Sequence, residues 1–461
     1  MGLISNVHIV YADDFTGAAA LGGALRELSV GSVVVNDLSP ETLVKVRNSN
    51  EVLIINAATR DVSPEHTRTI VAAALAETDS GRPESLFFRV DSTMRGNIAT
   101  TARAGRDFLK TRSVADCLVF VSIANPEAGR TVEHGLLRVW GDLASDTELA
   151  HDPTWNVTTS NVGEFLFESQ QDAARHVDES PTESWALIDP SVLERGIGHI
   201  LQYIQSLSES GARTFVVDGR NSADSMVVAQ VLSKIEASTP LCVLDSGPVL
   251  QALLSGANRI VIQESAQWQG NAKPVVVVSG SSTKKTRTQL EWLQDNFGAL
   301  ALPLLAGHNR PRANLSTVPT LASSLTSMNG DDVITLDSSL TLSGLDFAPQ
   351  DLAESLELAL AGVAKVCVAN PPAGLVLVGG ETCLQFLSAL DAVGIRPEGI
   401  LEPLMPFGTI VGGPLDGIPV VTKGGLVGGE ASLGRAVSHL RNVAEPETSK
   451  RRISELQKEG T

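Results

Sequence analysis

The sequence has few aromatic residues and fewer basic residues than acidic ones. Phe, Trp and Tyr make up 4% of the 461 residues, and 53 acidic residues face 35 basic ones, for a net charge of −18. Nucleic-acid binding depends on basic surfaces and on aromatic rings that stack on bases. These two shortages argue against a nucleic-acid partner, and an anionic substrate would need a locally basic pocket.

Cysteine and long apolar runs are also scarce. The four cysteines (Cys117, Cys242, Cys367 and Cys383) are scattered, and no pair has C-x-x-C spacing, so neither a zinc site nor a disulfide framework is indicated. Apolar runs such as PVVVVSG and GLVLVGG are far shorter than a membrane span, and no basic segment precedes an apolar stretch at the N-terminus. We therefore expect a cytoplasmic protein with reduced thiols and no membrane partner.

Strand and helix patterns alternate along the chain, which favours βαβ units and parallel sheets. In the first half we expect strands at 6–11, 31–36, 51–56, 85–90 and 116–121, followed by a polar excursion over 140–180. In the second half we expect strands at 275–279, 332–336 and 374–378, helices at 283–294, 349–364 and 381–391, and short strands near 407–411 and 418–423.

A chain of this length is too long for one core. The polar stretch 263–274 contains Gly and Pro and precedes a new strand, so we place a domain boundary there. The expected fold is α/β with two domains, each a mainly parallel sheet flanked by helices. They comprise residues 1–262 and 271–440, with a charged C-terminal tail at 441–461.

The stretch VYADDFTGAA (10–19) carries two carboxylates directly after a buried strand. The small apolar residues that follow predict a helix, with Thr16 as its N-cap. Asp13 and Asp14 would then lie at the carboxyl end of a strand, where open α/β sheets bind their ligands. The alternative is that one Asp caps the helix and the other is solvated.

Polar groups of both signs follow three further strands. They are Thr59 and Arg60, then Arg89, Asp91, Ser92, Thr93, Arg95 and Asn97, then Asn125, Arg130 and Thr131. Arginine pairs bidentately with carboxylates, and Asp, Ser and Thr can orient hydroxyl groups, so a small hydroxy acid suits this set. Each arginine alone could equally form a surface salt bridge.

Three glycine-containing turns mark the second half, two of them between a strand and a helix. They contribute Gly280, Ser281 and Ser282, then Gly379, Gly380, Glu381 and Thr382, then Lys423, Gly424 and Gly425. Such turns let a phosphate approach the backbone and a helix N-terminus. The chain has no G-x-x-x-x-G-K-[ST] loop and no clean G-x-G-x-x-G. Each turn alone could be structural, but three in one domain indicate a nucleotide.

The motifs YADDFTGA, DSTMRGN, NPEAGRT, VSGSSTKKTRTQL, GGET and TKGG occur in an order that resembles the four-carbon acid sugar kinases. The resemblance covers nearly the whole chain up to about Leu440. It implies that 1–262 binds the sugar acid, that 271–440 binds ATP, and that the active site lies in the cleft between the domains. It also implies that threonate, erythronate or 3-oxo-tetronate is converted to its 4-phosphate.

Phosphoryl transfer needs a carboxylate that orients the attacking hydroxyl and accepts its proton. We expect Asp13 or Asp14 in this role, with Asp91 the next choice. The substrate-binding set would be Arg60, Arg89, Asp91, Ser92, Thr93, Arg95, Asn125 and Arg130. ATP would lie on the three glycine turns with Mg²⁺ on its phosphates. The sequence identifies no metal ligands and leaves open whether the chain forms a homodimer.

Two other enzyme classes fit less well. An aspartyl phosphatase usually carries D-x-D, whereas the position two after Asp13 is Phe15. A hydride-transferring enzyme would need a dinucleotide fingerprint after the first strand, and ADDFTG is not one. A non-catalytic sensor of sugar acids stays open, because a binding pocket does not prove turnover.

Overall fold

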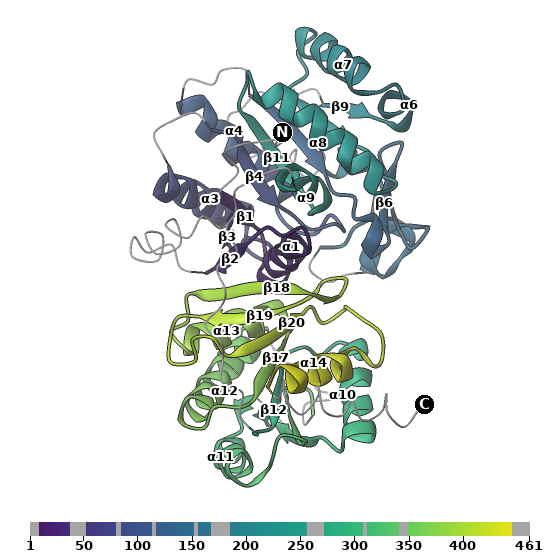
Figure 1. Ribbon diagram of the computed structural model, residues 1–461. Helices are drawn as coiled ribbons and strands as arrows, with labels where there is room; N and C mark the ends of the chain where they lie inside the picture. Colours follow the sequence, from purple (N-terminus) through teal and green to yellow (C-terminus); the bar gives the residue numbers. More distant parts are fainter. Residues whose placement is uncertain are drawn as a thin grey trace, which may run out of the picture. The chain divides into compact units, whose positions relative to one another are not determined.

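The computed structural model describes residues 9–36, 52–79, 84–112, 117–151, 155–166, 185–255, 272–307, 311–340 and 349–444. Its contacts divide the chain into two units, Met1–Ile262 and Gln263–Thr461, which are described separately (Figure 1). Helix α14 (Ser432–Ala444) includes the first four residues of the expected tail, and 445–461 lie outside the described residues.

The described part of unit 1 contains a parallel sheet in the order β2-β3-β1-β4-β11-β5-β10-β9. These strands are β1 (Ile9–Ala12), β2 (Ser32–Val35), β3 (Val52–Asn56), β4 (Leu86–Arg89), β5 (Leu118–Ser122), β9 (Trp185–Ile188), β10 (Thr214–Val217) and β11 (Leu241–Asp245). Most are buried along their whole length, as continuous apolar runs in a parallel sheet should be.

Helices cover both faces of this sheet (Figure 1). One face carries α3 (Pro64–Thr78) and α4 (Ile98–Thr111); the other carries α1 (Phe15–Glu27), α7 (Ile197–Glu209), α8 (Ser222–Glu236) and α9 (Pro248–Leu254), with the short α6 (Pro190–Leu193) beside α7. A small antiparallel sheet of β6 (Arg130–Glu133), β7 (Leu136–Val139) and β8 (Asp142–Leu143) follows β5. Residues 152–154 and 167–180 of the expected excursion lie outside the described residues.

Unit 2 has the order β13-β16-β12-β17-β20-β19-β18 among its described residues. The first five are parallel: β13 (Leu300–Pro303), β16 (Val333–Asp337), β12 (Val275–Ser279), β17 (Gly374–Val378) and β20 (Pro419–Lys423). The antiparallel strands β19 (Met405–Val411) and β18 (Gly394–Glu402) continue the sheet. A two-stranded ribbon joins β14 (Leu305–Ala306) and β15 (Arg312–Ala313).

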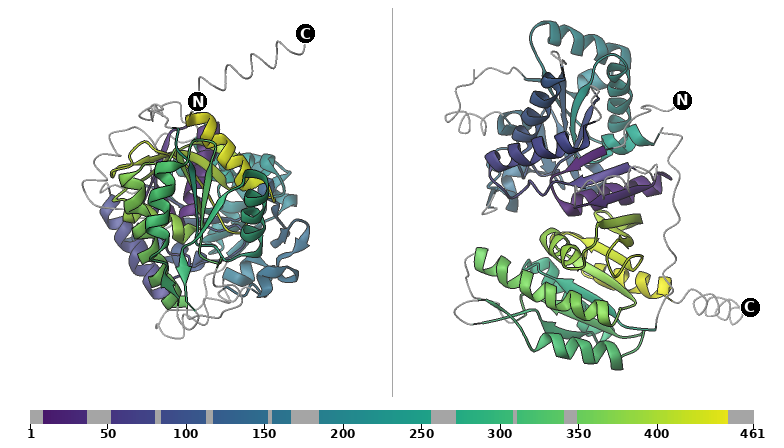
Figure 2. Two further views of the ribbon diagram at one scale, coloured as in Figure 1. Left: turned by 90° about the horizontal axis from the view of Figure 1, so that it is seen from below. Right: turned by 90° about the vertical axis from the view of Figure 1, so that its left-hand side faces the viewer.

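The core of unit 2 forms where α10 (Lys284–Phe297) and α14 pack on one face of this sheet. Leu290 and Leu293 of α10 and Leu440 of α14 belong to one buried cluster with Val277 and Val378 of the strands. The helices α11 (Thr317–Ser327), α12 (Pro349–Ala369) and α13 (Gly380–Ala389) form a separate packed set. Figure 2 shows from two further sides that each unit is a layer of strands between layers of helices.

The α/β class with mainly parallel sheets flanked by helices is confirmed, and the strands expected from the sequence are found within a few residues of their expected bounds. Strand β18 was not predicted. Its sequence GIRPEGILE contains two glycines and a proline, which usually mark a loop. The structure accommodates Pro397 and Gly399 at register shifts in the pairing with β19. The location of the active site between the domains stays a prediction.

No described helix is both long and apolar enough to cross a lipid bilayer.

Candidate active site

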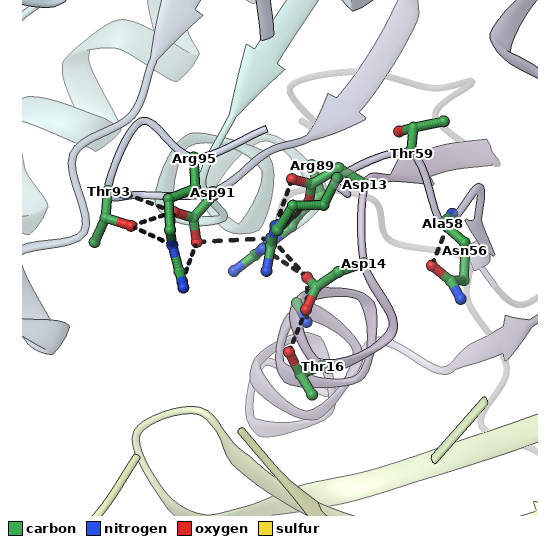
Figure 3. A network of polar contacts seen from close by, with 12 residues as sticks. Asp13, Asp14, Thr16, Asn56, Ala58, Thr59, Arg89, Asp91, Thr93 and Arg95 are labelled. Atoms are coloured by element: carbon green, nitrogen blue, oxygen red, sulfur yellow. Dashed lines mark hydrogen bonds and ion pairs between the residues drawn. The ribbon is translucent and has the colours of Figure 1, made fainter. Parts of the chain in front are cut away.

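The carboxyl ends of four neighbouring strands of unit 1 lie in one register. Ala12 of β1 pairs with Asn56 of β3 and with Arg89 of β4, and Arg89 pairs with Asp245 of β11. The loops that leave these strands carry the predicted polar residues. They bring together what we call the acid–arginine cluster: Asp13, Asp14, Arg60, Arg89, Asp91 and Arg95 (Figure 3).

Asp13 is held by a bidentate ion pair with Arg60. The Nε of Arg60 donates to Asp13 Oδ2 at 3.0 Å, and its Nη2 donates to Asp13 Oδ1 at 2.9 Å. Backbone hydrogen bonds from Asp13 N to Arg89 O and from Arg60 N to Asp13 O fix both residues at the strand ends. Asp13 is therefore buried and fully partnered, which rules out the alternative of a solvated carboxylate.

Asp14, and not Thr16, is the N-cap of α1. Its Oδ1 accepts a hydrogen bond from Gly17 N at 2.9 Å, and the Thr16 hydroxyl donates to its Oδ2. The expectation for Thr16 was wrong because the helix begins at Phe15, two residues earlier than a Thr16 cap would require, and Asp reaches the first-turn N–H groups equally well. Asp14 also accepts from Arg60 Nη2 at 2.8 Å and lies 3.4 Å from Arg89 Nη1.

Asp91 pairs with Arg95 in the loop after β4. The Nε and Nη2 of Arg95 donate to its two oxygens at 3.2 and 3.3 Å. The backbone N and the hydroxyl of Thr93 both donate to Asp91 Oδ2. The Arg60 Nη2 lies 3.6 Å from Asp91 Oδ1, so Arg60 links the two halves of the cluster.

Two asparagines hold the loops in place. The Nδ2 of Asn97 donates to Thr59 O and to Val62 O, both at 2.9 Å, which ties the loop after β4 to the loop after β3. Asn56 Oδ1 accepts from Ala58 N, where the backbone has a φ of 50°. The sequence predicted that Asn97 follows a strand, but not that its amide would bond to the loop after β3. It did not single out Asn56. Their amides position Arg60 and Arg95 through the backbone.

The three carboxyls differ in their affinity for protons. Burial, reinforced by the adjacent Asp14 charge, raises the pKa of Asp13 to about 6 in spite of Arg60 and Arg89. Burial acts in the same direction on Asp14, but there Arg60 and Arg89 outweigh it and lower the pKa. For Asp91, burial is outweighed by Arg95 and Arg60, so its pKa falls well below the usual range. Asp13 is thus the carboxyl that is poised to gain and lose a proton near neutrality.

Two arginines of the cluster each have one guanidinium nitrogen that donates no hydrogen bond within the described chain. The Nη1 groups of Arg60 and of Arg95 have no acceptor among the described residues. The side chains of Arg60 and Arg95 are 12% and 25% exposed. The sequence predicted that these arginines face a substrate carboxylate, and the structure shows that each is first engaged by a protein carboxylate. The free Nη1 groups are what remains for a ligand.

The other predicted substrate residues are placed as follows. Ser92 is buried next to Asp91. Asn125 accepts from Ala128 N and caps a short 3₁₀ turn (Pro126–Ala128), so its amide oxygen has a structural role. Arg130 donates to Ala128 O, and its buried Nε has no partner among the described residues. Burial lowers the Arg130 pKa, and the charges of Asp91 and Arg95 also act on it, which places Arg130 near the cluster.

Asp245 is a buried carboxyl at this edge that sequence reasoning missed. Its side chain is fully buried, its Oδ2 accepts from Gly247 N and Leu250 N, and its Oδ1 has no partner within the described chain. Burial raises its pKa to about 7. The stretch CVLDSG, an apolar run that ends in Asp and Gly, repeats the pattern of VYADD and was the available signal.

In unit 2, direct hydrogen bonds join the three predicted glycine turns. Gly280 N donates to Thr382 Oγ1 at 3.2 Å, which connects the first turn to the second. The hydroxyls of Thr283 and Thr286 both donate to Gly425 O at 2.9 Å, which connects the first turn to the third. A Cβ on Gly280 would collide with the side chain of Thr382, and one on Gly425 with that of Ser281, so a side chain at either position would have to displace its neighbour.

The second turn also leaves a helix N-terminus without a side-chain cap. Gly379, with a φ of 109°, is the N-cap of α13, and Gly380, Glu381 and Thr382 form its first turn. Uncapped N–H groups at a helix start bind anions readily. The three turns therefore form one glycine-lined edge whose geometry suits a phosphate.

The chain matches two domain models. Residues 8–253 match a sugar-binding N-terminal domain, and residues 276–433 match a nucleotide-binding C-terminal domain. A D-erythronate kinase from Heliobacterium modesticaldum is 25% identical over 96% of this chain and 99% of its own length. A D-threonate kinase from Salmonella typhimurium is 27% identical over 94% and 98% of the two chains. A 3-oxo-tetronate kinase from Brucella melitensis is 23% identical over 92% and 93%.

Solved structures share the fold. A Salmonella typhimurium protein superimposes with a TM-score of 0.70 at 21% identity, covering 93% of this chain and 98% of its own. A Haemophilus influenzae protein gives a TM-score of 0.66 at 19% identity, covering 95% and 99%. The two-unit α/β architecture is therefore also found in proteins of distant sequence.

Proposed function

The chain belongs to the four-carbon acid sugar kinase family, and from this premise we propose that it transfers the γ-phosphoryl group of ATP to the 4-hydroxyl of a four-carbon sugar acid. It is a phosphotransferase that acts on a hydroxyl group. Threonate, erythronate and 3-oxo-tetronate are the candidate substrates, because kinases of these three acids are its relatives over most of the chain.

The acid–arginine cluster is the observation that carries the proposal. It places three carboxylates beside guanidinium groups at one edge of a sheet, with the Nη1 groups of Arg60 and Arg95 unpaired within the described chain. A sugar acid has a carboxylate for such donors and hydroxyls for such acceptors. The cluster therefore offers complementary groups at both ends of one small molecule.

In the proposed reaction Asp13 accepts the proton of the 4-hydroxyl. The hydroxyl oxygen attacks the γ-phosphorus, the bond from the γ-phosphorus to the bridging oxygen breaks, and ADP leaves with that electron pair. A base works best when its pKa lies near the working pH, and among the three carboxyls of the cluster this favours Asp13. Asp14 orients Arg60 and Arg89, and Asp91 orients Arg95.

ATP is assigned to the joined glycine turns, with Gly280, Ser281 and Ser282 on one side and Gly379 to Thr382 and Gly424–Gly425 on the other. Mg²⁺ belongs to the proposal because it neutralises phosphate charge and is commonly bound through phosphates with only one or two carboxylates. Among the described residues no group of three or more His, Cys, Asp or Glu could hold a metal ion. We therefore assign it no ligands in this chain.

A panel assay tests the proposal. Purified protein is mixed with ATP and Mg²⁺ and with D- or L-threonate, D- or L-erythronate, or 3-oxo-tetronate, and ADP release is followed. The proposal requires ADP release that depends on one of these acids. A protein that binds an acid and ATP but never releases ADP would instead be the non-catalytic sensor.

A further inference from the structure

Lys423 is a fully buried lysine at the end of β20, and the roles assigned so far do not use it. Its exposed fraction is 0%. Its ammonium donates one hydrogen bond, to Gly424 O at 2.9 Å, and it has no ion pair with any carboxylate of the described chain. Two of its three N–H groups therefore lack an acceptor there.

Its charged neighbours do not neutralise it. Glu402, at the end of β18, attracts it electrostatically, but the carboxylate of Glu402 already accepts from Ser432 and Arg435. Lys285, in the first turn of α10, repels it. Burial above all lowers the Lys423 pKa, to about 8, so the ammonium is held at a cost in the free protein.

Lys423 belongs to the turn that the other two glycine turns contact. The backbone carbonyl of Lys423 accepts a hydrogen bond from Gly379 N at 2.9 Å. Two residues later, the carbonyl of Gly425 accepts hydrogen bonds from the hydroxyls of Thr283 and Thr286. The amide N–H groups of Gly424 and Gly425 have no acceptor among the described residues. The turn that carries the ammonium therefore also carries backbone donors that are available to an anion.

We propose that Lys423 donates to a phosphate group of the bound nucleotide. This inference rests on the proposed function, because it takes the glycine-lined edge to be the ATP site. An incoming phosphate supplies the counter-charge that the free protein lacks. A lysine of purely structural importance would instead be paired in the free protein.

Calorimetric titration of the full-length protein with ATP, ADP and adenosine tests this. We compare the wild type with Lys423→Met, which keeps the shape of the chain and removes the charge. Lys365→Met, an exposed lysine of α12 in the same unit, is the matched control. We expect Lys423→Met to raise the Kd of ATP and ADP at least tenfold, to leave the Kd of adenosine within twofold, and to leave the free protein at least as thermostable as the wild type.

The outcomes separate the two claims. Wild-type protein that binds no ATP contradicts the proposed function itself. If the wild type binds ATP and Lys423→Met binds it equally well, only the role of Lys423 fails. A variant that loses adenosine and ATP alike, or that is less thermostable or unfolded, shows that the charge serves the fold, and it also overturns the inference. Lys423→Arg, which keeps the charge, should retain more ATP affinity than Lys423→Met.

Discussion

At the scale of single residues, Asp13 and Asp14 are neighbours in the chain but have different surroundings. Asp13 forms an ion pair with Arg60 and has a raised pKa, whereas Asp14 caps α1 and has a lowered pKa. We expect Asp13→Asn to lower kcat by about 100-fold or more, the usual contribution of a general base. Asp14→Asn should lower kcat far less, because Asn caps helices as well as Asp does. Steady-state kinetics on both variants decide this.

The pH dependence of the reaction gives a second view of the same pair. A base must be deprotonated, so kcat/KM should fall as the pH drops through the Asp13 pKa of about 6, by about tenfold per pH unit below it. If Asp14 were the base, the fall would begin only below its ordinary value of 3.8, because its pKa is lowered. A profile that stays flat down to pH 4.5 would remove Asp13 from this role.

Arg95 is the better residue for testing recognition of the substrate carboxylate. Removing Arg60 would leave both Asp13 and Asp14 without their main partner, so its effect would mix binding with folding. We expect Arg95→Ala to weaken sugar-acid binding by about 2–5 kcal/mol and to affect a neutral four-carbon polyol less. Arg68→Ala, which removes an exposed ion pair with Asp107, is the control and should change neither. Equal losses for acid and polyol would make Arg95 structural.

At the scale of elements, the start of α1 depends on a glycine. A Cβ on Gly17 would collide with the guanidinium of Arg89 and the carboxylate of Asp14. Gly17→Ala should therefore displace Arg89, destabilise unit 1 by about 1–3 kcal/mol and abolish most activity. Gly198→Ala, in α7 where nothing lies within 4 Å of the added atom, should cost neither stability nor activity. Thermal melts and the kinase assay on both variants check this pair.

The sequence predicted strands β1 to β5 of the first sheet, β12, β16, β17, β19 and β20 of the second, and the polar ends of β1, β3 and β4. It did so because buried parallel strands form apolar runs and ligand residues follow them directly. It did not predict that Arg60 would form a bidentate ion pair with Asp13. Such a pairing joins residues 47 positions apart, and only the register of the sheet brings them together. Lys423 was noticed as part of a turn, but its complete burial at the end of β20 was not predicted.

At the scale of the whole molecule, the assignment of ATP to unit 2 stays a prediction that a fragment can test. Residues 271–444 contain all three glycine turns and their own core, so the fragment should fold and bind ATP. Ligand at a hundredfold excess over Kd adds about 2.7 kcal/mol. For a domain of this size that shifts Tm by about 5 °C. Gly380→Val, at the first position of α13, should abolish the shift.

The complementary fragment, residues 1–262, should show no shift with ATP and a shift with the sugar acid that is the substrate. ATP stabilisation of that fragment alone would mean that the DDFTG turn is the nucleotide site, and the two domain assignments would be reversed.

Phosphorus NMR of the full-length protein tests the central claim, transfer from ATP to a sugar acid, most directly. Protein, MgATP and each candidate acid are incubated, and the phosphorus signals are followed. The account predicts that the γ-phosphate signal of ATP decays while a phosphomonoester signal grows, coupled to the protons on C4 of one of the acids. Growth of inorganic phosphate alone, or an unchanged spectrum with every acid when ATP and an acid are both bound, would contradict it.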